Sequence, residues 1–291
     1  MFGESIVALV TPFRDDKVDL QALGQLIEWQ IQSGTDGILV CGSTGEGLLL
    51  SDSEKSSIIS SAIDISSGRV PILVGCSSCS TREAIELVKM AEGLGANGVL
   101  VIAPFYVKPT QKGIIEHFTR IHDSSNIPII IYNNPGRCSV NISVDTIIDI
   151  SCMDRVLALK DSNTNLDRVT MIKSLVKPSF LLFSGDDSSV AGFLAHGGNG
   201  AISVTANVVP SLLKKLLIAW RDRDIHTFQE INQMLVPISE SLFIEPNPIP
   251  VKYALHRMGF IQNEIRLPLL SASEVTIQRI DEILNKLNDL Q

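Results

Sequence analysis

Lys160 is the residue whose type and position in this sequence most clearly suggest chemistry. It ends the run Val-Leu-Ala-Leu-Lys at 156–160, in which every other residue is apolar. If this run is a buried strand, alternation directs Lys160 to the same side as Ala158, toward a barrel interior. Burial there favours the uncharged amine, which can attack a ketone. The segment alone would equally suit a lysine that reaches a carboxylate at a barrel rim.

Two hydroxyl groups follow another apolar run. The segment Gly-Ser-Thr-Gly-Glu at 42–46 places Ser43 and Thr44 beside backbone N–H groups where a strand would pass into a helix. Such a junction can hold an anion, for example a substrate carboxylate. In isolation an ordinary turn or helix cap explains the segment at least as well.

A tyrosine and an arginine follow a third run. Tyr132 ends the apolar stretch 128–132, and a buried phenol must find a hydrogen-bond partner. Arg137 can bind a carboxylate through two N–H groups. A rim tyrosine and a surface arginine are the alternative. Convergence of these residues with Lys160 and the two hydroxyls on one mouth would favour an active site.

Eight short runs rich in isoleucine, valine and leucine could position these residues. They alternate with longer amphipathic stretches, among them Leu20–Gln32 and Thr81–Gly93, which we expect to be helices. The alternation predicts an α/β fold, a (β/α)8 TIM barrel, whose working face lies at the carboxyl ends of the strands. The expected strands are Ile6–Val10, Gly37–Cys41, Pro71–Gly75, Gly98–Ile102, Pro128–Tyr132, Val156–Lys160, Phe180–Phe183 and Gly200–Val204.

A helical extension is expected after the barrel. The proline-rich segment 245–250 has a restricted backbone and predicts a rigid connection within it. We therefore expect a barrel over residues 1–223 and a C-terminal α-helical extension over 224–291 that packs on the barrel. The predicted helices are Pro210–Arg223, Thr227–Phe243, Val251–Met258 and Val275–Leu287.

Composition and charge favour small-molecule partners. The 291 residues are 45% hydrophobic, enough for one large core, and the formal net charge is -8. Lysine and arginine are scattered, so no basic face predicts binding to nucleic acid or to anionic membranes. The stretch Ile6–Val10 lacks a basic region before it and is too short for a signal peptide or membrane span. We expect a cytoplasmic protein.

The five cysteines form no paired framework and suit a reducing compartment. Cys76 and Cys79 form a C-x-x-C. A zinc site would need a second ligand pair, and a redox site would need thioredoxin-like surroundings; the sequence offers neither. We expect ordinary thiols and no metal.

The motifs together resemble, from end to end, the pyruvate-dependent class I aldolase family that includes dihydrodipicolinate synthases and N-acetylneuraminate lyases. The resemblance implies that Lys160 forms an imine with pyruvate, that Tyr132 shuttles protons, and that Ser43 and Tyr106 complete a hydroxyl relay. No metal or organic cofactor is then needed, because the iminium nitrogen itself is the electron sink. The matching segments are 42–46, 104–106, 132–137, 160, 184–187 and 200–207.

The resemblance also implies the binding residues and the assembly. Thr44 and the backbone at Ile202 would hold the pyruvate carboxylate, Gly185 would contribute to substrate binding, and Arg137 would clamp the carboxylate of L-aspartate-4-semialdehyde. The tyrosine matching Tyr106 reaches in from a neighbouring subunit, which implies a homo-oligomer that is at least a dimer; most relatives are tetramers. The product would be 4-hydroxy-tetrahydrodipicolinate, and the reaction would be the committed step toward diaminopimelate and lysine.

Two alternatives stay open. A lyase acting on a longer 2-oxo sugar acid is suggested by Ser43, where the synthases commonly have threonine, whereas Arg137 and the segment 245–252 resemble the synthases. A non-catalytic barrel that only binds a small carboxylic acid is the rival from a different class, because fold alone does not fix function.

Regulation by lysine is expected to be weak or absent. In lysine-inhibited synthases the product site uses histidine, asparagine, glutamate and tyrosine, and only the glutamate has a match here, Glu83. The other positions hold Cys79, Phe105, Asp52 and Lys55. Lys55 would place a like charge near the ammonium groups of the ligand.

Overall fold

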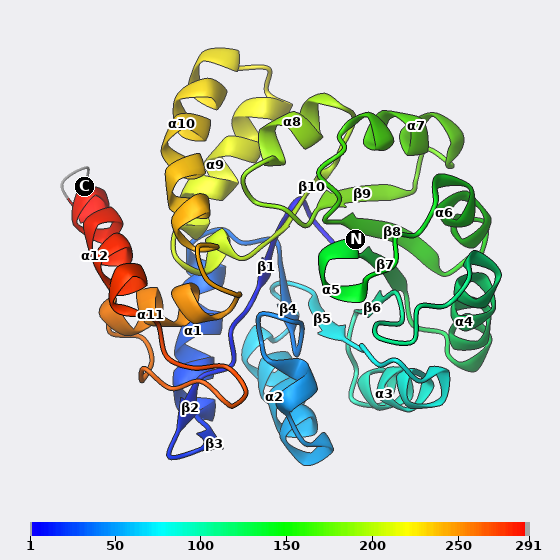
Figure 1. Cartoon of the computed structure of the whole chain (residues 1–291), viewed down its shortest axis with the longest axis horizontal. Coiled ribbons are helices and arrows are strands. Elements are labelled where there is room, and N and C mark those ends of the chain that lie inside the picture. Colours follow the sequence, from blue (N-terminus) through cyan, green and yellow to red (C-terminus); the bar gives the residue numbers. More distant parts are fainter. Residues whose placement is uncertain (1, 289–291) are drawn as a thin grey trace.

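The computed structural model describes residues 2–288, with a closed barrel of parallel strands at its centre (Figure 1). The barrel order is β1-β10-β9-β8-β7-β6-β5-β4, and β4 closes back onto β1. The expected (β/α)8 TIM barrel is confirmed. Its strands are β1 (Ser5–Ala8), β4 (Gly37–Val40), β5 (Ile72–Gly75), β6 (Gly98–Ile102), β7 (Ile129–Asn133), β8 (Val156–Asp161), β9 (Leu181–Ser184) and β10 (Gly200–Ser203).

Each barrel strand overlaps one of the predicted apolar runs. Nearly all strand residues are buried, because one face fills the barrel and the other lies under the helices. The bounds of β6 are those predicted, and elsewhere no strand end differs from the prediction by more than two residues. The largest difference is in the first strand, which ends at Ala8 rather than Val10.

Many of the helices around the barrel begin just after a side chain that accepts a hydrogen bond from one of their first free N–H groups. α1 (Leu20–Gln32) and α3 (Thr81–Gly93) have the predicted bounds, and the caps are Asp19, which accepts from the N–H of Ala22, and Ser80, which accepts from that of Glu83. The others are α2 (Asp52–Ser66), α4 (Gln111–Ser124), α6 (Val144–Ser151), α7 (Asp167–Leu175), α8 (Val190–Ala195) and α9 (Pro210–Arg221).

Short elements between strands and helices were not predicted. A hairpin of β2 (Phe13–Arg14) and β3 (Lys17–Val18) turns through Asp15 and Asp16, whose φ values are 54° and 58°. The short helix α5 (Pro135–Cys138) and the 3-10 turns η1 (Gly47–Leu49) and η2 (Thr205–Asn207) follow barrel strands.

The C-terminal region is helical, as predicted. α10 (Ile225–Ser241) lies along α9, and α12 (Glu274–Asn288) packs on α10 and α11 (Ile249–Arg257) (Figure 1). α10 begins just after the expected boundary at residues 223 and 224, although the division into barrel and extension stays a prediction. Among residues 2–288 no helix is long and apolar enough to cross a membrane.

Candidate active site

Lys160 and Tyr132 lie side by side at the carboxyl ends of β8 and β7. They are register partners, and Lys160 Nζ lies 4.6 Å from the centroid of the Tyr132 ring. Each residue is only 5% exposed. The amine is therefore held in a largely dry place beside a phenol, which is the environment expected of a nucleophilic lysine with a proton-transfer partner.

The surroundings of the Tyr132 hydroxyl favour loss of its proton. Asn134 Nδ2 donates a hydrogen bond to Tyr132 Oη at 2.8 Å. Burial alone would raise the pKa of this phenol, but the charges of Lys160 and Arg137 and the hydrogen-bonding groups of Asn134 and Ser162 outweigh burial and lower it. A phenol with a lowered pKa gives up its proton more readily near neutral pH.

Gly185 leaves room for the lysine chain. A Cβ added at Gly185 would lie 2.9 Å from Lys160 Cε and 2.3 Å from Ser162 Oγ. Any larger residue would push the lysine chain or Ser162 aside. The structure thus places Gly185 against the side chains of Lys160 and Ser162.

Asp187 is a buried carboxylate near Lys160 that lies in a matching segment but received no role from the sequence. It accepts hydrogen bonds from the backbone N–H groups of Val204 and Thr205, at 2.9 and 2.7 Å, and from Thr205 Oγ1 at 2.9 Å. Burial raises its pKa despite these bonds and despite the opposing charge of Lys160. The segment after β10 is thereby fixed to the segment after β9.

A buried polar network holds the ends of β7 and β8 together on the outside of the barrel. Arg168 Nε donates to Asp161 Oδ2 at 2.9 Å, and Asn133 Nδ2 donates to Asp161 Oδ1 at 2.8 Å. Asn133 and Asp161 follow Tyr132 and Lys160 directly and face the opposite side of the sheet. The network therefore stabilises the register that brings the tyrosine and lysine together.

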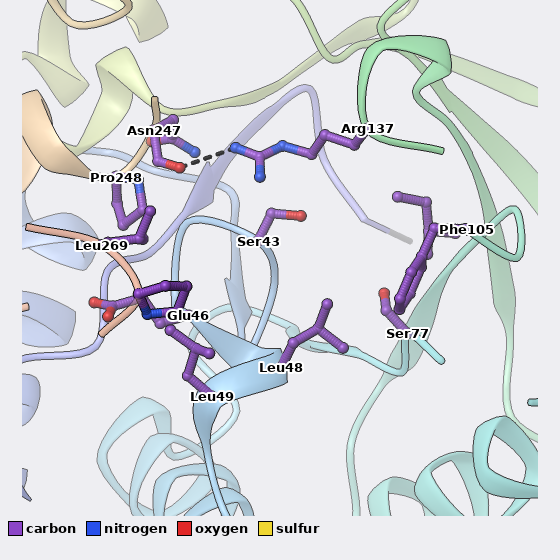
Figure 2. Close-up of a pocket in the computed structure, with 12 residues that line it drawn as sticks. Ser43, Glu46, Leu48, Leu49, Ser77, Phe105, Arg137, Asn247, Pro248 and Leu269 are labelled. Atoms are coloured by element: carbon purple, nitrogen blue, oxygen red, sulfur yellow. Dashed lines mark hydrogen bonds between the residues drawn. The ribbon is translucent and has the colours of Figure 1, made fainter. Parts of the chain in front are cut away.

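The segment 42–47, which we call the hydroxyl loop, carries Ser43 and Thr44 after β4. Thr44 is buried and its Oγ1 accepts a hydrogen bond from Asn247 Nδ2 at 3.0 Å. Thr11 Oγ1 donates to the carbonyl of Gly45 at 2.7 Å. Ser43 lies in the loop with its side chain toward the cavity described next (Figure 2).

Arg137 reaches across a cavity of about 410 Å³ (Figure 2). Its Nη2 donates to the carbonyl oxygen of Asn247 at 2.9 Å, and its backbone N–H donates to Asn134 Oδ1 at 3.1 Å. Asn134 thus links Arg137 to Tyr132, and Asn247 links Arg137 to Thr44. The lining is Ser43, Glu46, Leu48, Leu49, Ser77, Ile102, Phe105, Arg137, Asn247, Pro248, Pro268 and Leu269.

The structure does not bring all of the predicted site residues together around one cavity. Lys160 and Tyr132 are not themselves in the lining of this cavity. Ile202 lies on β10, separated from β8 by β9, and contact of its backbone with a substrate stays a prediction. Tyr106 is 89% exposed with φ 68°, so within one protomer its side chain lies in solvent. A relay through Tyr106 would need a second subunit.

Sequence reasoning gave no role to four residues that shape this site: Asn134, Ser162, Asp187 and Asn247. All but Ser162 lie in segments that resemble the family, and for Asn134 the available signal was its position two residues after a strand-ending tyrosine. Within residues 2–288 there is no cluster of three or more histidine, cysteine or acidic side chains arranged to hold a metal ion.

Comparison with known proteins places the chain among enzymes of one kind. The family model described as the dihydrodipicolinate synthetase family matches residues 1–287. The 4-hydroxy-tetrahydrodipicolinate synthase of Rickettsia bellii is 43% identical over 288 residues, covering 99% of this chain and 98% of the relative.

Two solved structures show the same architecture. Dihydrodipicolinate synthase from Aquifex aeolicus superposes with a TM-score of 0.97 at 42% identity, covering 99% of this chain and 98% of that one. The chloride-inhibited dihydrodipicolinate synthase from Acinetobacter baumannii, solved as a complex with pyruvate, has a TM-score of 0.96 at 36% identity and covers 99% of both chains.

Proposed function

This chain belongs to the dihydrodipicolinate synthetase family, and from that premise we propose that it condenses pyruvate with L-aspartate-4-semialdehyde through an imine on Lys160. The product is 4-hydroxy-tetrahydrodipicolinate, on the route to diaminopimelate and lysine. The observation that carries the proposal is the Lys160 amine, 5% exposed and 4.6 Å from the Tyr132 ring. The names of the relatives support a synthase rather than the rival lyase.

The reaction begins on the ketone of pyruvate. Once it has lost its proton, the Lys160 amine attacks C2, and loss of water from the carbinolamine leaves an iminium. The iminium acidifies the methyl group, which loses a proton to give an enamine. The enamine carbon bonds to the aldehyde carbon of the semialdehyde. The amino group of the semialdehyde then attacks the imine carbon, closes the ring and releases Lys160, so that one water is lost overall.

Protons move through hydroxyl groups in this scheme. Tyr132 donates to and accepts from the carbinolamine, which its lowered pKa and its place beside Lys160 support. Ser43 passes the proton on, and Tyr106 completes the relay from a neighbouring subunit. The high exposure of Tyr106 in one protomer supports this assembly, a homodimer at least and a tetramer if such dimers pair.

The carboxylates of the two substrates are bound at two separate subsites in this proposal. Thr44, the backbone at Ile202 and the space at Gly185 receive pyruvate, and Arg137 binds the carboxylate of the semialdehyde. Asn247 contacts both Thr44 and Arg137, which supports the view that the two subsites adjoin.

Lysine inhibits this enzyme weakly or not at all in our proposal. A cavity of about 420 Å³ is lined by three of the residues at the expected product site, Asp52, Lys55 and Glu83. Glu83 already accepts a hydrogen bond from Ser78 Oγ at 2.7 Å, and Lys55 pairs with Asp52 at 3.3 Å. A bound lysine would have to displace the serine and tolerate the Lys55 ammonium. The expected cytoplasmic location also stays a prediction.

A turnover assay tests the function. Purified protein is mixed with pyruvate and L-aspartate-4-semialdehyde, and the products are analysed by mass spectrometry. We expect a product that combines one molecule of each substrate less water and forms only when both are present. A folded protein that makes no such product, or that instead cleaves N-acetylneuraminate, would exclude the proposed function.

A further inference from the structure

A buried ion pair ties the hydroxyl loop to the C-terminal extension. Lys252 Nζ, on α11, lies 2.6 Å from Glu46 Oε1, and the two side chains are 2% and 0% exposed. The second oxygen, Glu46 Oε2, accepts the backbone N–H of Arg266 at 3.0 Å. Both carboxylate oxygens of Glu46 are therefore bound by residues from beyond the barrel.

The hydroxyl loop has a backbone that needs such restraint. Glu46 has a φ of 53° and Cys41, just before the loop, has a φ of 55°, a left-handed conformation that is unfavourable for residues with a side chain. The next position is crowded, since a Cβ at Gly47 would lie 1.9 Å from the carbonyl oxygen of Cys41. A strained backbone of this kind persists only where surrounding contacts determine it.

Stability alone does not explain an ion pair in this place. Removing two charges from water costs energy that their attraction barely returns, and well-packed apolar replacements are often as stable. The pair does restrain the hydroxyl loop. Because both carboxylate oxygens of Glu46 are bound, the backbone at Glu46 is held in one position. Ser43 and Thr44 stand three and two residues, respectively, before that fixed point.

A second contact from the same stretch reaches the hydroxyl itself. Asn247 Nδ2 donates to Thr44 Oγ1 at 3.0 Å. A hydroxyl oxygen that accepts this bond keeps its own proton free, so Thr44 can donate it to a ligand carboxylate. Asn247 and Lys252 lie five residues apart in the extension and hold the hydroxyl loop at Thr44 and at Glu46.

We propose that Glu46 and Lys252 are positioning residues for the pyruvate carboxylate, acting through the backbone of the hydroxyl loop on Thr44. The inference rests on the proposed function, because it assumes that Thr44 receives pyruvate. The C-terminal extension is then part of the binding apparatus, and the buried pair acts through the loop backbone.

The test compares two double variants by imine trapping. Glu46→Gln/Lys252→Met removes both charges together and keeps an acceptor for the Arg266 N–H. The matched control is Asp36→Asn/Lys214→Met, which removes a different lysine–carboxylate pair. Lys214 Nζ lies 2.5 Å from Asp36 Oδ1, and Asp36 accepts the Glu4 and Ser5 N–H groups at the amino end of β1. Each protein is reduced with borohydride over a range of pyruvate concentrations, after circular dichroism has shown it to be folded.

Positioning and stability affect different features of the trapping curve. We expect Glu46→Gln/Lys252→Met to raise the half-saturating pyruvate concentration roughly 10-fold or more, with the plateau retained, because displaced hydroxyls weaken binding but leave Lys160 intact. Partial unfolding would lower the plateau without moving the midpoint. The control should shift the midpoint less than about twofold, as expected for a site distant from the change.

Two results would overturn the inference. An unmoved midpoint in the folded Glu46→Gln/Lys252→Met variant would show that the pair does not position the loop. An equal shift in the control would show a general effect of lost ion pairs. Absence of any adduct in the unaltered protein is a separate outcome, which would remove the proposed function and this inference with it.

Discussion

Replacement of Tyr132 by phenylalanine separates proton transfer from packing at the site. The substitution keeps the ring that lies 4.6 Å from Lys160 Nζ and removes only the hydroxyl. The hydroxyl accepts a hydrogen bond from Asn134 Nδ2 at 2.8 Å, and Ser162 is a further hydrogen-bonding group beside it. The change therefore removes the proposed proton carrier with little other disturbance.

We expect Tyr132→Phe to have a large effect on kcat and a small effect on the free energy of unfolding. Loss of a positioned proton-transfer group reduces kcat about 10²- to 10⁴-fold, equivalent to roughly 3–5 kcal/mol in the activation free energy. Loss of the hydrogen bond should cost only about 1 kcal/mol of folding free energy, because the Asn134 amide is half-buried and can reach water. Tyr132→Phe should thus be a stable protein that turns over slowly.

The assay measures kcat and the free energy of unfolding for Tyr132→Phe and for a matched variant, Tyr253→Phe. Tyr253 is also buried and donates through its hydroxyl to Asp281 at 3.2 Å, on the helices of the extension. Tyr253→Phe should lose similar stability and keep its kcat. If Tyr132→Phe retained more than about a tenth of the kcat, the assignment of Tyr132 as proton shuttle would be refuted.

Three further predictions follow from other groups. Arg137→Ala should lower semialdehyde turnover roughly 10- to 100-fold and leave pyruvate trapping nearly unchanged; equal loss of both would argue against its role as the semialdehyde clamp. Burial lowers the pKa of His117 from 6.5 to about 4, so the unfolded chain binds its proton first as pH falls, and up to about 3 kcal/mol of stability should be lost between pH 6.5 and 4. His117→Gln should flatten that part of a stability–pH curve, and an unchanged slope would exclude His117 as the cause. Millimolar lysine should leave the activity of the purified enzyme largely intact, and clear inhibition at physiological lysine would contradict the proposal.

Much of the barrel could be predicted because its signals are local. A strand buried on both faces must be apolar along its length, so each strand could be recognised in the sequence as a continuous apolar run. The bounds of α1 and α3 were readable because a capping side chain stands directly before each, Asp19 and Ser80. The hairpin β2–β3 escaped notice because two-residue strands have no detectable alternation.

The site residues that could be predicted are likewise those with a local signal in the sequence. Lys160 and Tyr132 were predictable because each is a polar group that ends an apolar run. Asn247 was not, because its partner Thr44 lies 203 positions away and only the fold joins them. Arg168 shows the same limit, since an arginine in the first turn of a helix would ordinarily be exposed, and here it is buried against Asp161.

The identity of the nucleophile is the central claim, and adduct mapping on Lys160 tests it most directly. The protein is incubated with pyruvate, reduced with borohydride, digested and analysed by peptide mass spectrometry. We predict one pyruvate-derived group per chain, located on Lys160, and none in a folded Lys160→Met variant. An adduct on another lysine, or no adduct on the folded unaltered protein, would contradict the claim.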